Sequence, residues 1–205
     1  MHMDRRQFVK NLGLGTASLS MGSLVTASSC APSGDSSLKQ NVKEGEDGQF
    51  LFIGDDIAIA QTEYGKVQGY LLNHVYTFLG VPYGADTSGK NRFMPPQKPE
   101  PWTDVRPAVF YGNTAPQRME NRWPNNYGTF ADHWNYWDVS EDCLYLNVWT
   151  PGIADGKKRP VLVWLHGGGF TNGSGIEQDG YHGENISREG NIVFCSINHR
   201  LGPIG

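Results

Sequence analysis

The sequence predicts an α/β fold with a mixed, mostly parallel sheet, of which this chain supplies only a part. Two runs, 161–165 and 192–197, are almost continuously apolar, which is typical of strands covered on both faces. Between them lies one short helical candidate, about Gly183 to Glu189, which Gly190 is placed to end in a left-handed conformation. The other helices that such a sheet requires have no evident pattern in these 205 residues, so the predicted fold is incomplete.

The first 30 residues have the layout of an export signal. Arg5, Arg6 and Lys10 precede a mildly apolar stretch, 11–29, that is rich in Gly, Ala, Ser and Leu. Such a layout is typical of a signal peptide, and the adjacent arginines resemble a bacterial twin-arginine signal. The alternative is an N-terminal helix with two chance arginines, which the many Gly and Ser residues disfavour. A transmembrane span is excluded because the apolar residues never run to the ~18 that one needs.

Cys30 is a candidate site of lipid attachment. Small residues precede it, and the flexible polar stretch 31–34 follows it. This arrangement resembles a bacterial lipoprotein attachment cysteine, although Ala27 stands where an aliphatic residue is usual. The alternative is simple cleavage of a soluble signal near the same place. The expected destination is therefore outside the bacterial cytoplasm: the periplasm, the cell surface as a lipoprotein with a membrane tether at Cys30, or the medium.

The chain divides into a signal (1–30), a flexible linker (31–55) and a domain (56–205). The linker is polar, charged and Gly-rich to about Gly54, with no apolar period. The irregular stretch 113–138 holds many aromatic side chains, which either serve function or pin a loop onto the domain. Within the domain, short apolar runs punctuated by Gly, Pro and Asn predict strands at 57–61, 66–72, 75–79, 144–150, 161–166 and 192–198.

Composition and charge narrow the class of partner. The net charge is −4, and the Lys and Arg residues beyond position 30 are scattered, so no footprint for nucleic acid or anionic lipid is present. This charge distribution favours a small-molecule substrate over nucleic acid or an anionic membrane surface. Cys30, Cys143 and Cys195 have neither a metal-ligand spacing nor the even number of a disulfide framework. No metal or cofactor is predicted.

The strongest chemical signal is the apolar run 161–165 leading directly into His166 and the glycines 167–169. In α/β-hydrolases the loop after such a strand supplies backbone N–H groups to the oxyanion hole. Glycines let the backbone approach the reacting carbonyl with no Cβ in the way. Loss of one such donor costs a serine hydrolase roughly 3 to 4 kcal/mol. The alternative is a glycine-rich turn without catalytic purpose, which the preceding strand makes the weaker interpretation.

Further segments resemble the type-B carboxylesterase family, which includes the cholinesterases. They agree with it in order and spacing from about Ile57 to Gly205, and His199 replaces a tyrosine of the family pattern. The matching segments are Phe78-Leu79-Gly80-Val81-Pro82-Tyr83-Gly84, Arg92-Phe93 with Pro95-Pro96 and Pro101-Trp102, the run 140–151 (SEDCLYLNVWTP), and Asn198-His199-Arg200-Leu201-Gly202.

The resemblance implies that this chain is the N-terminal part of an α/β-hydrolase domain. Gly168 and Gly169 match the glycines whose N–H groups line the family's oxyanion hole, and Gly167 matches the supporting first glycine. The family's nucleophilic serine lies in a Gly-x-Ser-x-Gly elbow, which would come after Gly205 with the acid and histidine later still. The nearest local sequence, 172–176 (NGSGI), has the wrong spacing for that elbow.

Two further points qualify the resemblance. In many members the cysteine matching Cys143 is bridged to one just before a Pro-Gln pair, but Ala115 occupies that place here. Cys143 therefore has no obvious partner, and Cys195 is expected to be a packed apolar residue. His166 and His199 are expected to be structural rather than general bases.

The predicted function is carboxylic-ester hydrolysis through a serine acyl-enzyme, with a small-molecule ester as substrate. This chain alone is expected to be inactive, because the oxyanion donors are present without the nucleophile. Two alternatives remain open. One is a non-catalytic binding or adhesion protein of the same fold. The other is a truncated remnant. The presence of an intact serine elbow after Gly205 separates the enzyme from both.

Overall fold

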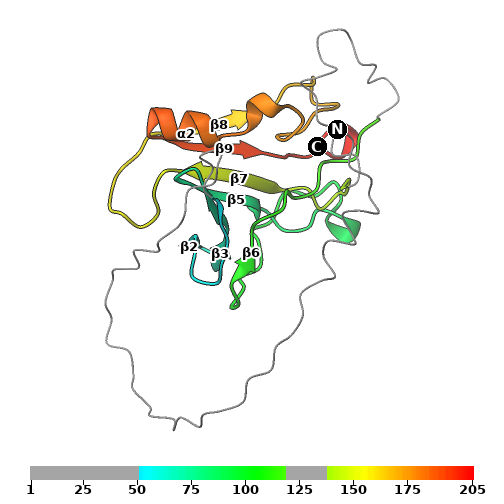
Figure 1. Cartoon of the computed structure of the whole chain (residues 1–205). Helices are drawn as coiled ribbons and strands as arrows, with labels where there is room; N and C mark the ends of the chain where they lie inside the picture. The colour runs from blue at the N-terminus through cyan, green and yellow to red at the C-terminus, as the bar shows by residue number, and fades with distance from the viewer. Residues whose placement is uncertain (1–50, 119–137) are drawn as a thin grey trace, which may run out of the picture. The chain divides into compact units, whose positions relative to one another are not determined.

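The computed structural model describes residues 51–118 and 138–205 (Figure 1). The predicted signal, Cys30, nearly all of the linker and most of the aromatic stretch 113–138 lie outside the described residues. Among the residues described, no helix is long and apolar enough to cross a membrane.

The main sheet has the strand order β1-β4-β5-β7-β9-β8. Its part β5-β7-β9-β8 can be followed in Figure 1. Among its described strands, β8 and β9 pair in parallel, whereas every other neighbouring pair is antiparallel. The prediction of a mixed sheet is confirmed, but for this part "mostly parallel" is wrong. The long segment between β8 and β9 supplies the crossover that parallel pairing needs, whereas the short turn between β4 and β5 gives an antiparallel pair. The bounds are β1 Leu51–Phe52, β4 Tyr70–Leu72, β5 Val75–Pro82, β7 Tyr145–Thr150, β8 Val161–Leu165 and β9 Val193–Ile197.

A second, small sheet contains β2 (Ile59–Gln61), β3 (Lys66–Gln68) and β6 (Arg106–Pro107). The stretch 66–72, predicted as one strand, is therefore two, because β3 lies in the small sheet and β4 in the large one. The break falls at Gly69, where a Cβ would come within 2.0 Å of the Thr77 carbonyl oxygen. β1 falls inside the stretch interpreted as linker and pairs with β4.

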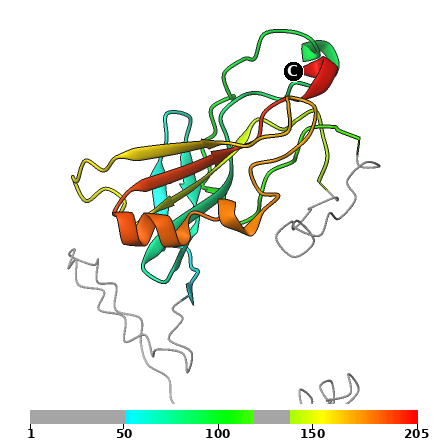
Figure 2. The ribbon, with the colours of Figure 1, turned by 90° about the horizontal axis from the view of Figure 1, so that it is seen from above.

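Helix α2 (Glu184–Gly190) crosses between β8 and β9 and packs against β5, β7 and β9 (Figure 2). The buried Ser187 hydroxyl donates to the Trp149 carbonyl at 3.0 Å, which fixes the helix to β7. The left-handed residue after the helix is Asn191 (φ 46°), not Gly190 as predicted. Asparagine tolerates that conformation, so the helix continues through Gly190. Single 3₁₀ turns occur at Gly89–Asn91, Asp179–Tyr181 and Gly202–Ile204.

The two apolar strands differ in burial. In β9, Phe194, Cys195 and Ser196 are buried, as predicted. In β8 all five residues are exposed, with relative exposures from 37% to 63%, so its predicted burial on both faces is not found in this chain. β8 is the last strand of the sheet and pairs with β9 alone among the described strands. The Trp164 ring contacts the Tyr181 ring, with centroids 5.0 Å apart, but none of the five side chains is buried among the described residues.

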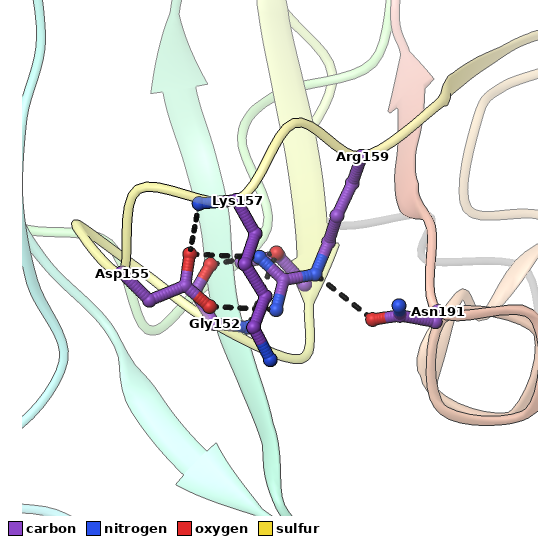
Figure 3. Close-up of polar contacts among 6 residues, drawn as sticks. Gly152, Asp155, Lys157, Arg159 and Asn191 are labelled. Carbon is purple, nitrogen blue, oxygen red and sulfur yellow. Dashed lines mark hydrogen bonds and ion pairs between the residues drawn. The ribbon is translucent and has the colours of Figure 1, made fainter.

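The turn between β7 and β8 is closed by a polar clasp (Figure 3). The guanidinium of Arg159 donates to both carboxylate oxygens of Asp155, at 3.0 and 2.7 Å, and to the Asn191 side-chain oxygen at 3.0 Å. The side chain of Arg159 is only 7% exposed. Bidentate arginine–carboxylate pairing has a fixed geometry. Because Arg159 also bonds Asn191, the clasp connects the residues before β8 to the end of α2.

Replacing Asp155 with Asn should lower the thermal unfolding midpoint at pH 6. The hydrogen bond from Arg159, and that from the Lys157 N–H, lower the pKa of Asp155 from 3.8 to about 2. A depressed carboxyl pKa adds stability that is present above about pH 4 and disappears as the pH falls through 2. The difference between wild type and Asp155→Asn should therefore shrink over that interval. The matched control is Glu63→Gln, since the Glu63–Lys98 pair is 69% and 79% exposed and should contribute little. Equal midpoint losses for both variants would contradict the assignment.

Candidate oxyanion-hole site

The glycine loop, residues 167–173, is separated by the single residue His166 from the end of β8 at Leu165. The carboxyl end of a parallel strand is the usual place for binding loops in α/β proteins. Gly167, Gly168, Gly169 and Phe170 are all exposed, and Phe170 reaches 82%. The sequence-predicted candidates Gly168 and Gly169 thus lie together on an accessible turn.

Gly168 is the position in this loop where glycine is required. Its φ is 117°, which side chains rarely adopt, and a Cβ would lie 1.9 Å from the Asn172 carbonyl oxygen. Gly169 also has a positive φ, 61°, but a Cβ there meets nothing within 4 Å. At Gly167 a Cβ also meets nothing within 4 Å. Gly168 is therefore the glycine of this loop at which another backbone segment comes too close for a side chain.

The carbonyls of Gly167 and Gly168 are held by hydrogen bonds, whereas the N–H groups of Gly168 and Gly169 are not. The Gly168 carbonyl accepts from the N–H and hydroxyl of Thr171, at 3.1 and 3.0 Å, and from the Asn172 N–H at 3.2 Å. Among hydrogen bonds between described residues, none is donated by the N–H of Gly168 or Gly169. In a trans peptide the N–H is directed opposite to the carbonyl. Fixing the carbonyls therefore leaves two oriented donors for an anionic or carbonyl oxygen.

Side chains from two distant segments support the loop from behind. The Gln117 amide accepts from the Gly173 N–H at 2.8 Å and donates to the Gly173 carbonyl at 3.0 Å. The Asn198 side chain, 2% exposed, accepts from the Gly175 N–H at 2.8 Å and donates to the Asn113 carbonyl at 3.0 Å. Asn198 lies in a segment that matches the family, and Gln117 belongs to the Pro-Gln pair after Ala115, but neither was predicted to support the loop. The Pro-Gln pair was the available signal for Gln117.

Both predicted structural histidines lie beside the loop. Their rings stack with centroids 4.5 Å apart and planes at 4°. His166 is 8% exposed and its Nδ1 lies 2.8 Å from the Gly167 carbonyl, while His199 makes the equivalent contact with the Arg200 carbonyl at 2.9 Å.

The two described cysteines, Cys143 and Cys195, are buried and free. Burial raises the pKa of Cys143 to about 12 and that of Cys195 to about 11. Thiols with such pKa values are poor nucleophiles at neutral pH. Ala115 packs in the same buried cluster as Cys143, in keeping with a place where related proteins carry the partner cysteine. No group of His, Cys, Asp or Glu that could hold a metal ion occurs in the described part of the chain.

The family profile described as "Carboxylesterase family" matches residues 56–205. The chain belongs to the carboxylesterase family. Its relatives include a phenmedipham hydrolase of Pseudarthrobacter oxydans, 44% identical over 72% of this chain and 29% of that protein. A para-nitrobenzyl esterase of Bacillus subtilis is 39% identical over 72% of this chain and 28% of that protein.

Solved structures show the same relationship for this carboxylesterase chain. An esterase of Clostridium hathewayi superposes with a TM-score of 0.67 at 37% identity, covering 77% of this chain and 30% of that one. The predicted partial α/β-hydrolase fold is therefore confirmed. The chain spans less than a third of the length of these relatives.

Proposed function

We propose that this chain forms the oxyanion-hole part of a serine carboxylic-ester hydrolase. The observation that carries the proposal is the exposed turn at the end of β8, whose Gly168 and Gly169 N–H groups donate to no other described residue. The nucleophilic serine, the acid and the histidine are supplied by polypeptide that follows Gly205.

In the proposed reaction the serine oxygen attacks the ester carbonyl while the histidine takes the serine proton. Negative charge then develops on the former carbonyl oxygen, which the N–H groups of Gly168 and Gly169 stabilise. These donors act in the transition state because they are already oriented by the bonds on the loop carbonyls. Collapse of the intermediate expels the alcohol, which takes the proton, and water later releases the acid from the acyl-enzyme.

Small neutral esters are the proposed substrates. The scattered charges of the chain give no site for a polyanion. One relative is named a para-nitrobenzyl esterase, which supports aromatic esters as the first compounds to test. Para-nitrophenyl acetate is a suitable chromogenic substrate of that class.

The test begins with the DNA that follows the Gly205 codon. We expect it to encode a Gly-x-Ser-x-Gly elbow in frame, and we call residues 1–205 together with that encoded polypeptide the extended protein. The extended protein should hydrolyse para-nitrophenyl acetate, and changing the elbow serine to alanine should abolish turnover. An elbow without serine would favour a non-catalytic binding protein, and an immediate stop codon a remnant; either result would overturn the proposal.

We also propose that the protein is exported through the twin-arginine signal. Arg5 and Arg6 are the paired basic residues of the signal region. Replacing both with lysine should leave precursor in the cytoplasm, because this signal type depends on the arginine pair rather than on charge alone. Cell fractionation with an antibody to the domain measures the outcome. Normal amounts of exported protein in the double variant would show that the signal is of another type.

Lipid attachment at Cys30 is a separate proposal. The short polar stretch after Cys30 would tether the domain to a membrane. Cys30→Ala should move the protein from the membrane fraction to the soluble fraction. Cys143→Ala is the matched control, because that cysteine is buried in the domain. If wild type and Cys30→Ala are equally soluble, the signal is cleaved without lipidation.

A further inference from the structure

We propose that His166 is a positioning residue that orients the Gly168 N–H of the oxyanion hole. The inference rests on the proposed function, and it assigns this histidine a task beyond ending a strand. His166 would act through the peptide bond between Gly167 and Gly168, without touching the substrate.

The contact that carries the inference is between His166 Nδ1 and the Gly167 carbonyl oxygen, 2.8 Å apart. A carbonyl oxygen only accepts, so Nδ1 must carry the hydrogen. The same rigid peptide unit contains the Gly167 carbonyl and the Gly168 N–H, which are directed oppositely. The buried His166 ring therefore holds the Gly167 carbonyl toward the protein interior, and this directs the Gly168 N–H toward the exposed side of the loop.

The His166 ring is itself held firmly enough for this task. It is 8% exposed and stacks on His199 with planes at 4°. Gly173 closes the other side: a Cβ on Gly173 would lie 2.6 Å from His166 Nδ1, so the ring and a side chain could not both fit. The bonds of Gln117 to Gly173 keep that backbone in place. Gln117, Gly173 and His166 thus form a continuous support beneath the loop.

The next peptide unit provides an internal comparison. The Gly168 carbonyl, which shares its peptide with the Gly169 N–H, accepts from three donors, two of them backbone groups. The Gly167 carbonyl accepts from His166 alone among the described residues. The Gly167–Gly168 peptide therefore depends on the single His166 donor, and loss of that donor should free this peptide to rotate.

The first test compares His166→Asn with His166→Gln in the extended protein. The amide nitrogen of Asn can occupy the place of Nδ1, whereas that of Gln reaches the place of Nε2. We expect His166→Gln to lower kcat for para-nitrophenyl acetate by roughly 10- to 100-fold with KM changed less than about twofold, below the loss for deleting a donor. His166→Asn should recover most of kcat. Equal losses in Asn and Gln, or none in either, would overturn the inference.

A spectroscopic test is independent of turnover. In residues 1–205 only the bonds 167–168 and 168–169 join glycine to glycine, so protein labelled with [1-¹³C,¹⁵N]glycine shows just these two amides in a carbonyl-filtered spectrum. Signals from any Gly-Gly bonds in the polypeptide after Gly205 are recognised because they remain in the spectrum of a Gly168→Ala variant. His166→Gln should shift or broaden the Gly168 amide more than that of Gly169, and His166→Asn should restore it. An unchanged Gly168 amide overturns the positioning role even if ester turnover is found. Absent turnover with the expected amide changes overturns only the proposed function.

Discussion

Gly168→Ala should lower kcat of the extended protein toward para-nitrophenyl acetate by about 10²- to 10³-fold, the loss typical of removing one oxyanion donor. The added Cβ would lie 1.9 Å from the Asn172 carbonyl oxygen and 2.6 Å from the oxygen of its side chain. Backbone cannot yield by that much without moving, so the loop must shift and the two N–H groups lose their alignment. KM should change little, because the donors act mainly on the transition state.

The neighbouring glycines are matched controls for this prediction. Gly167→Ala should stay within a few-fold of wild type, because a Cβ there meets nothing within 4 Å. Gly169→Ala should be intermediate, because its φ of 61° strains a side chain although the space is open. Steady-state kinetics of the three variants give the order. If Gly167→Ala loses as much activity as Gly168→Ala, the loop geometry described above is not the catalytic one.

Purified residues 31–205 should self-associate and show no ester turnover. All five side chains of β8 are apolar and at least 37% exposed, and the strand has one free edge among the described strands. Exposed apolar strands with open edges recruit other chains. The expected signs are concentration-dependent association in analytical ultracentrifugation and strong binding of a hydrophobic dye.

The absence of ester turnover expected for residues 31–205 has a chemical cause. Oxyanion donors lower a barrier only after a nucleophile has attacked, and no serine elbow is present in the sequence. Turnover should equal that of the same chain carrying Gly169→Val, and the extended protein should lose the dye binding. A monomeric 31–205 chain whose turnover exceeds background and falls in the Gly169→Val variant would contradict this prediction and require an unrecognised nucleophile.

Local features of the sequence predicted the central strands and the candidate loop well. The apolar run of β8 followed by three glycines placed Gly168 and Gly169 on one turn, because strand propensity and glycine freedom act within a few residues. The same reasoning failed at Gly69, where one apolar run serves two sheets, and at Gly190, where the left-handed residue is Asn191. The failure at Gly69 depended on neighbours that are distant in sequence, whereas the shift to Asn191 reflects the tolerance of asparagine for the left-handed conformation.

By itself the sequence determined the family, the position of the glycine loop after a strand, and the absence of a serine elbow from these residues. Only the tertiary structure decided how the loop is held. The Gln117 side chain accepts a hydrogen bond from the Gly173 N–H, 56 positions away in sequence, and the His166 ring stacks on the His199 ring. His166 and His199 meet because they follow β8 and β9, which are parallel neighbours in one sheet. The physical reason is that hydrogen bonds and ring contacts require atoms within a few ångströms, and the sheet, rather than local propensity, sets those distances.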